Sequence, residues 1–161
     1  MILLLLILLI LILIVLGLSY TQENFIINDN NKLCIMAIFK NEHTYMEEWL
    51  KHHLEQGISH FYLYSNDEKM ENYIFLDKYK NNITVIPWIN KKNNGSSTIQ
   101  RQAYTHCIKN YSNSCKYIMM LDLDEFLFGI NDKVINIINK LELESDTVQI
   151  KSIKIPRFDY G

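Results

Sequence analysis

The sequence of 161 residues contains few of the residues that mark several common classes of protein. Its three cysteines, Cys34, Cys107 and Cys115, are too few for a disulfide framework. A formal net charge of −2 leaves no excess of positive charge for a nucleic-acid-binding face, so we expect no nucleic-acid partner. The five histidines complete no zinc site, because His52 and His53 are adjacent and would point to different faces of a helix.

Basic residues are also missing from the N-terminal segment, where the first lysine is Lys32. Residues 2–18 contain only Ile, Leu, Val and one Gly, and a helix over them would be roughly 26 Å long, just enough to cross a thin bilayer. A signal peptide cleaved near Ser19 is the alternative. We therefore expect a transmembrane signal-anchor or signal peptide at residues 1–19 and a stem at residues 20–32. The rest of this single-pass membrane protein would face the ER or Golgi lumen.

Three glycosylation sequons, at Asn82, Asn94 and Asn110, suit a lumenal protein. A chain so rich in Asn would contain one or two of them by chance. An oxidising lumen would also allow a disulfide between Cys107 and Cys115, which would leave Cys34 as a free, buried thiol.

Strand-like and helix-like segments alternate from residue 33 onward. The apolar patterns predict strands at residues 33–39, 60–64, 83–88, 117–127 and 147–155, and helices at residues 41–57, 68–80, 98–110 and 132–141. Asn41 is the expected N-cap of the first helix, and Gly57 its left-handed C-terminal residue. The alternation indicates one α/β domain over residues 33–161, with a mainly parallel, Rossmann-like sheet. No helix follows the last expected strand, so we expect this domain to be incomplete at its C-terminus.

The most informative segment is the apolar run that begins at Tyr117 and ends in Asp122, Asp124 and Glu125. Ligands of parallel sheets bind beyond the carboxyl ends of the strands, where these acids would lie. On an extended backbone Asp122 and Asp124 would face one site, roughly 7 Å apart, and Glu125 would turn aside. Two such carboxylates repel each other unless a proton or a cation lies between them. We predict Mg²⁺ or Mn²⁺, which also binds phosphates; a solvated strand end that caps the next helix is the alternative.

Polar side chains also follow the first two expected strands, at Asn41 and Glu42 and at Asn66 and Asp67. Amides and acids at neighbouring strand ends can hydrogen-bond ribose hydroxyls and a base edge, so we predict a nucleoside site. Helix capping by Asn41 and Glu42 and an ordinary turn at Asn66 and Asp67 are the simpler interpretations.

Gln100 and Arg101 lie in the first turn of the helix that follows the Gly/Ser-containing loop. Free backbone N–H groups and a forked guanidinium at this position suit a diphosphate. A solvated arginine on a surface helix is the simpler interpretation.

A set of motifs with defined spacing connects these segments. It consists of Lys40-Asn41-Glu42, Tyr45, Glu48-Trp49-Leu50, His53, Gly57, Phe61–Asn66, Gln100, Ala103-Tyr104, Cys107 and Leu121–Leu127. These residues resemble the pattern of glycosyltransferase family 92 and of the family-2-like glycosyltransferases over about residues 33–128. The resemblance implies a GT-A fold, of which this chain would be the nucleotide-sugar-binding half.

The resemblance also implies roles for individual residues. Asp122 and Asp124 match the DXD motif, which holds Mn²⁺ or Mg²⁺ against the diphosphate of a nucleotide sugar. Glu42, Asn66 and Asp67 match positions near the nucleoside. The expected activity is that of a hexosyltransferase-like enzyme, which moves a sugar from a nucleotide-sugar donor to a glycan or protein acceptor. Family members continue past Gly161, where their catalytic base is expected.

Within this chain, Asp159 is a weak candidate for the catalytic base, as the late acid in a loop-like setting. Two alternatives stay open. A nucleotide-sugar-binding protein without catalysis would need only the donor site. A haloacid-dehalogenase-type phosphatase would use Asp122 as nucleophile and Asp124 as acid/base. Against the phosphatase, Phe126 stands where that motif has Thr or Val, and little sequence follows it.

Overall fold

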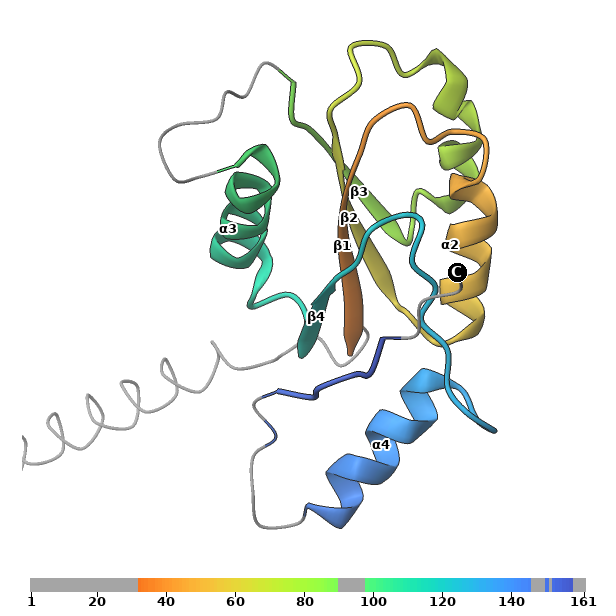
Figure 1. Ribbon diagram of the computed structural model, residues 1–161, viewed down its shortest axis with the longest axis vertical. Coiled ribbons are helices and arrows are strands. Elements are labelled where there is room, and N and C mark those ends of the chain that lie inside the picture. The colour runs from red at the N-terminus through yellow and green to blue at the C-terminus, as the bar shows by residue number, and fades with distance from the viewer. Residues whose placement is uncertain (1–31, 90–97, 146–149, 151, 158–161) are drawn as a thin grey trace, which may run out of the picture.

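The computed structural model describes residues 32–89, 98–145, 150 and 152–157. These residues form an α/β fold in which helices cover both faces of a four-stranded sheet (Figure 1). The expected membrane segment at residues 2–18 lies outside the described residues. Within them, no helix is long and apolar enough to span a bilayer.

The sheet is entirely parallel and has the strand order β3-β2-β1-β4. Its strands are β1 (Leu33–Phe39), β2 (His60–Ser65), β3 (Ile83–Pro87) and β4 (Tyr117–Met120). β1 pairs with both β2 and β4, and six of its seven residues are buried. A strand covered on both faces needs apolar side chains on both, which explains its continuous apolar run. The predicted parallel α/β sheet is therefore confirmed.

Helices on the two faces enclose two separate cores. On one face, α2 (Met46–Glu55), the 3₁₀-helix η1 (Glu71–Tyr79) and α4 (Val134–Glu144) pack over the odd-numbered residues of β1. On the other face, α3 (Ile99–Tyr111) packs over Cys34 and Met36 and over Tyr62 and Tyr64 of β2. Figure 1 shows α3 on one side of the sheet and α2 with η1 on the other.

Several predicted elements differ from the structure. Asn41 is not a helix N-cap: its φ is 60°, and α2 begins only after Tyr45. The second expected helix is the 3₁₀-helix η1, with non-helical backbone angles at Tyr73. The fourth strand ends at Met120, because a turn begins directly after Leu121. The expected strand at residues 147–155 is wrong for its described residues, 150 and 152–155, which form no strand.

The disulfide also differs from the one considered. Cys34 bonds to Cys115 and Cys107 is the free, buried cysteine. β1 and β4 are neighbours, with Cys34 opposite Ile118, so Cys115 just before β4 reaches the same face as Cys34. Sequence spacing suggested a bridge across eight positions, whereas the sheet brings together cysteines separated by 81.

Candidate functional site

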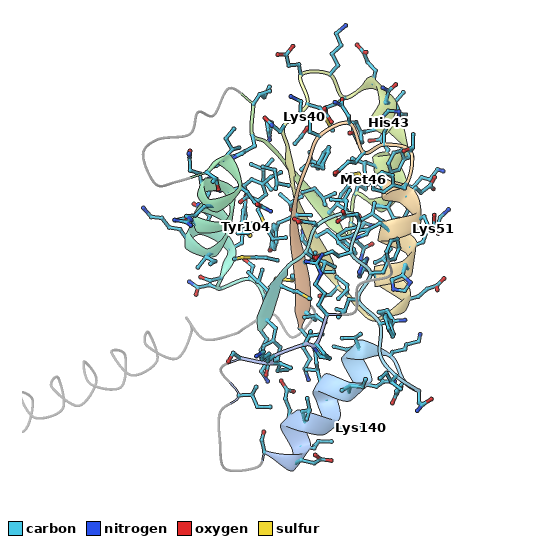
Figure 2. The ribbon with its side chains drawn as sticks, in the orientation of Figure 1. Lys40, His43, Met46, Lys51, Tyr104 and Lys140 are labelled. Carbon is cyan, nitrogen blue, oxygen red and sulfur yellow. A yellow bond between two sulfur atoms is a disulfide. The ribbon has the colours of Figure 1, made fainter. Side chains whose placement is uncertain are left out.

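The carboxyl ends of β1 and β4 lie side by side at the point where the chain changes direction across the sheet. From β1 the chain passes through α2 to β2 and through η1 to β3; α3 then returns it over the opposite face to β4. Open α/β sheets bind ligands at such a switch point, because the two loops diverge there and leave a crevice. The loop after β1, with Lys40 and His43, lies at this end (Figure 2).

The acids after β4 lie on a tight turn. The Leu121 N–H donates to the Met36 carbonyl (3.1 Å), and the Glu125 N–H donates to the Asp122 carbonyl (3.1 Å). Leu121 and Leu123 are buried, whereas Asp122 and Asp124 are exposed. The predicted extended backbone is therefore wrong, but both aspartates still lie opposite the buried leucines.

The third acid, Glu125, folds back onto its own turn. Its Oε2 accepts from the Asp122 N–H (3.2 Å), and its Oε1 forms an ion pair with Arg157 (3.2 Å). Glu125 therefore stabilises the turn by accepting a hydrogen bond from the Asp122 backbone.

Helix α3 holds Asp122 from one face of the sheet. Gln100 Nε2 donates to Asp122 Oδ1 (3.0 Å) and to the Tyr104 hydroxyl (2.6 Å). The Thr98 side chain caps α3 by accepting from the Arg101 N–H (3.2 Å), and Arg101 is exposed in the same turn. The side chain of Gln100, a predicted diphosphate ligand, is thus positioned to orient a carboxylate.

The ends of β1 and β2 are tied together by Asp67. Its two carboxylate oxygens lie 3.0 and 3.1 Å from the Asn41 nitrogen, and one also accepts from the Tyr73 hydroxyl (2.5 Å). The same hydroxyl accepts from the Glu42 N–H (3.0 Å). Asn tolerates the positive φ that turns the Asn41 N–H toward this carboxylate. The Asn66 N–H completes the junction by donating to the Phe39 carbonyl (2.9 Å).

Glu42 carries a carboxylate oxygen that lacks a partner. Its Oε2 is buried and accepts no hydrogen bond. Burial raises the pKa of Glu42, the Tyr45 hydroxyl opposes this, and the charges of Asp124, Asp122 and Asp67 raise it further. The pKa of Asp122 is also raised, by partial desolvation of its carboxyl group on this exposed residue and by the charges of Glu125 and Asp124. A cation would relieve this repulsion.

Within the described parts of the chain, no three His, Cys, Asp or Glu side chains are grouped closely enough to hold a metal ion by themselves. Mg²⁺ commonly takes one or two carboxylates from a protein and completes its coordination with water and substrate phosphates. The carboxylates of Asp122 and Asp124 have the oxygen chemistry for an ion that takes its other ligands from water and a diphosphate.

Sequence reasoning assigned no role to Tyr73, Tyr104 or the histidines of α2. Tyr73 lies 31 positions from Glu42 and Tyr104 lies 18 positions from Asp122, so only the fold brings each pair together. The motif spacing that includes Tyr104 and His53 was the one available signal. Asp159 lies outside the described residues.

Comparisons with known proteins agree on one family. The profile of glycosyltransferase family 92 matches residues 31–160. Similar proteins include family-92 proteins of Oryza sativa subsp. japonica, 24% identical over 102 residues, and of Arabidopsis thaliana, 24% identical over 103 residues. The matches cover 60% and 61% of this chain but only 16% of either relative. No solved structure matches significantly.

Proposed function

We propose that this chain, which belongs to glycosyltransferase family 92, forms the nucleotide-sugar-binding half of a metal-dependent glycosyltransferase with a GT-A fold. The observation that carries the proposal is the turn at the switch point, where Gln100 and Tyr104 hold Asp122 beside Asp124. Because the matches span only 16% of the curated relatives, the reaction, the donor and the acceptor are all part of the proposal.

In this proposal Asp122 and Asp124 hold Mn²⁺ or Mg²⁺. The bound ion would neutralise the departing nucleoside diphosphate as a Lewis acid. The Gln100 amide donates to Asp122 Oδ1 and thereby fixes the orientation of this carboxylate. The second oxygen of Asp122 is not bonded by Gln100, and in this proposal it binds the ion. The guanidinium of Arg101, one residue further along the first turn of α3, supplies a second positive group for the diphosphate.

The nucleoside would lie against the ends of β1 and β2. Glu42 offers an unpartnered carboxylate oxygen, and Asn66 a half-buried amide. Asp67 contributes mainly by fixing the backbone of Asn41. Transfer also needs a base to take the proton of the acceptor hydroxyl. The family resemblance places this base beyond Gly161, and within the given sequence Asp159 is a weak candidate for the role.

Binding without transfer is the second candidate function, because the residues assigned here, apart from the weak candidate Asp159, all act on the donor side. Turnover of nucleotide sugars with glycan and protein acceptors distinguishes the two. Because the chain belongs to glycosyltransferase family 92, we do not propose the phosphatase alternative for it.

The Cys34–Cys115 disulfide supports placing this domain in an oxidising compartment, such as the lumen of the secretory pathway. The side-chain amides of two sequon asparagines both donate to backbone carbonyls, Asn110 to His106 (2.7 Å) and Asn82 to Ser59 (3.2 Å), but Asn110 is exposed near the end of α3 and Asn82 is half-buried. Asn110 is therefore the better placed of these two to carry a glycan.

Calorimetry of the full chain with UDP and GDP, in Mn²⁺ or in EDTA, tests the donor site. We expect binding only with the metal, and at least about tenfold weaker binding in Asp124→Asn, since even outer contacts of metal sites are worth about 10–100-fold in affinity. Asp77→Asn is the matched control, because Asp77 is an exposed aspartate on η1. Equal affinity in Mn²⁺ and EDTA would reject the metal-dependent site.

A further inference from the structure

The backbone that follows the acidic turn is held by side chains of α2. Trp49 Nε1–H donates to the Glu125 carbonyl (2.8 Å), and His52 Nε2–H donates to the Leu127 carbonyl (2.8 Å). The Leu127 N–H donates to His53 Nε2 (3.0 Å). Three side chains of one helix thus bond three backbone groups, those of Glu125 and Leu127.

The contacts of His53 fix its tautomer. A backbone N–H can only donate, so Nε2 accepts from Leu127 and carries no proton. Nδ1 therefore carries the proton and donates to the Trp49 carbonyl (2.8 Å). The side chain is 0% exposed, its ring lies 4.4 Å from that of Trp49, and burial lowers its pKa to about 4. Neutral His53 is thus a rigid bridge between α2 and the segment after the turn.

The hydrogen bonds from α2 hold the backbone of Glu125 and Leu127, which lie beyond the end of β4 and have no strand pairing. The last ladder contact of this chain segment is the Leu121 N–H on Met36, and the strand stops before the acids. The segment is also anchored by three buried leucines, Leu121, Leu123 and Leu127. Apolar packing is non-directional, so it keeps these side chains in the core but does not fix the orientation of the backbone between them. Hydrogen bonds are directional, so α2 sets the course of the backbone on one side and α3 orients Asp122 on the other.

We propose that His53 and Trp49 are positioning residues that hold the Asp122–Asp124 turn in the geometry needed to bind a divalent cation. This inference rests on the proposed function, because it assigns the turn to the metal. His53 acts through the Leu127 N–H, and Trp49 acts through the Glu125 carbonyl.

Two substitutions of His53 separate positioning from packing. Gln can place its carbonyl oxygen near the position of Nε2 and still accept from Leu127, whereas the shorter Asn reaches only the Nδ1 position. In Mn²⁺ titrations of the full chain followed by electron paramagnetic resonance, we expect His53→Asn to weaken binding about tenfold and His53→Gln to stay within about threefold of the unsubstituted chain. His60→Asn is the matched control, since His60 bonds Thr84 at the other end of β2 and should leave Mn²⁺ affinity unchanged.

Hydrogen–deuterium exchange of the same variants provides a readout that needs no metal. His53→Asn should speed exchange in peptides covering residues 121–129 and leave peptides covering residues 60–65 unchanged. If the unsubstituted chain binds no Mn²⁺, the proposed function fails, and selective faster exchange still supports positioning of the turn. Unchanged exchange and unchanged Mn²⁺ affinity in His53→Asn would overturn the inference.

Trp49→Phe keeps an aromatic ring but removes the N–H, so it decides the question if His53→Asn does not fold. We expect its Mn²⁺ affinity to fall about threefold or more. Wild-type affinity and wild-type exchange at residues 121–129 in Trp49→Phe would then overturn the inference.

Discussion

Asp67 shows how a polar residue at a strand end can serve the backbone beside a binding site. Its carboxylate accepts from the Asn41 N–H and from the Tyr73 hydroxyl, and the Asp67 residue is 8% exposed. A buried carboxylate needs such donors, because burial without them costs several kcal/mol. Asn41 and Asp67, two of the residues predicted to bind a nucleoside, thus fix the backbone of the loop that carries Glu42.

Tyr73→Phe tests this junction at the residue scale. The variant keeps the ring, which packs 5.0 Å from Phe39, but removes a hydroxyl that contacts both Asp67 and the Glu42 N–H. We expect the free energy of unfolding in urea to fall by roughly 1.5–3 kcal/mol, as for hydrogen bonds to buried charged groups. Tyr79→Phe is the control, because its hydroxyl bonds the partly exposed Glu47; an equal loss there would mean that Asp67 has no special role.

Helix α4 is attached to the rest of the fold at both ends. Near its start, Gln56 Oε1 accepts from the Gly129 and Val134 N–H groups (3.3 Å each). Gly57 has a φ of 92°, and a Cβ there would lie 2.3 Å from the side chain of Ile135, so glycine allows both the turn after α2 and close contact with α4.

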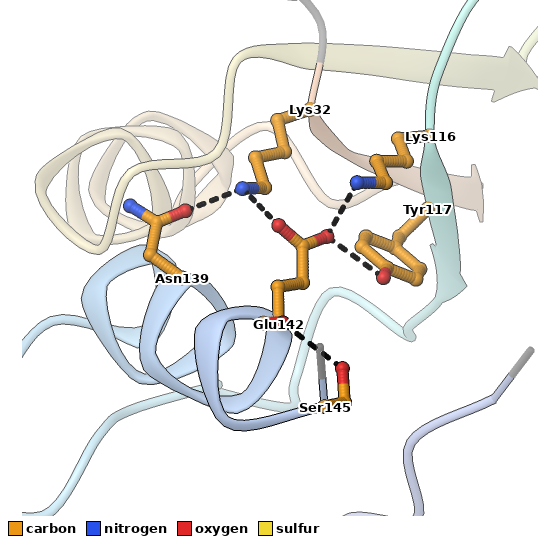
Figure 3. A network of polar contacts seen from close by, with 6 residues as sticks. All are labelled: Lys32, Lys116, Tyr117, Asn139, Glu142 and Ser145. Atoms are coloured by element: carbon orange, nitrogen blue, oxygen red, sulfur yellow. Dashed lines mark hydrogen bonds and ion pairs between the residues drawn. The ribbon is translucent and has the colours of Figure 1, made fainter. Parts of the chain in front are cut away.

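The last turn of α4 is bound by ionic and polar contacts (Figure 3). Glu142 forms ion pairs with Lys32 and with Lys116 (2.8 Å) and accepts from the Tyr117 hydroxyl (2.8 Å). Burial favours the neutral form of Glu142, but the hydrogen bonds from Lys116, Lys32 and Tyr117 outweigh it and lower its pKa from 4.5 to about 2. The charged carboxylate therefore stabilises the start of β1 and β4 against α4.

The pH dependence of this element follows from the direction of the pKa shift. A lowered folded-state pKa gives stability that is present above pH 4.5 and is lost as the pH falls toward about 2. Glu142→Gln should lower the free energy of unfolding by roughly 1.5–3 kcal/mol at pH 7. The difference between the variant and the unsubstituted chain should shrink between pH 4.5 and 2 in urea titrations. Glu144→Gln, at an exposed position in the same turn, is the control; a difference that stays constant with pH would contradict the assignment.

At the scale of the whole molecule, the Cys34–Cys115 disulfide joins β1 to the segment before β4, across 81 positions of sequence. The bond closes the chain between Cys34 and Cys115 into one covalent loop, which limits the conformations of the unfolded chain. The bond lies in the core beneath α3, together with the free Cys107.

Removal of this disulfide should destabilise the domain strongly. A cross-link over a loop of this length is worth about 4.5 kcal/mol in the chain-entropy model, so Cys34→Ala with Cys115→Ala should lower the Tm markedly in calorimetry. Cys107→Ala is the matched control, because it removes a buried thiol without opening a loop. Reducing agent should lower the Tm of the unsubstituted chain and leave that of the double variant unchanged. If reducing agent changed the Tm of neither protein, the disulfide assignment would be contradicted.

Local pattern determined much of this protein. The continuous apolar run of β1 and the alternation of strands and helices predicted the parallel α/β sheet, and the end of the first helical pattern predicted the positive φ of Gly57. The order and spacing of short motifs between Lys40 and Leu127 indicated the family, because they can be recognised along the chain without knowledge of the fold.

Contacts between distant residues were decided only by the tertiary structure. The pairing of Cys34 with Cys115, the use of Asp67 by the Asn41 backbone and the bond from Leu127 to His53 join residues 81, 26 and 74 positions apart. Each depends on which strands become neighbours and where a turn begins, and these are set by the burial of whole elements against one another. Sequence therefore determined which groups stand at the strand ends, and packing determined which of them hold the backbone and which stay free for a ligand.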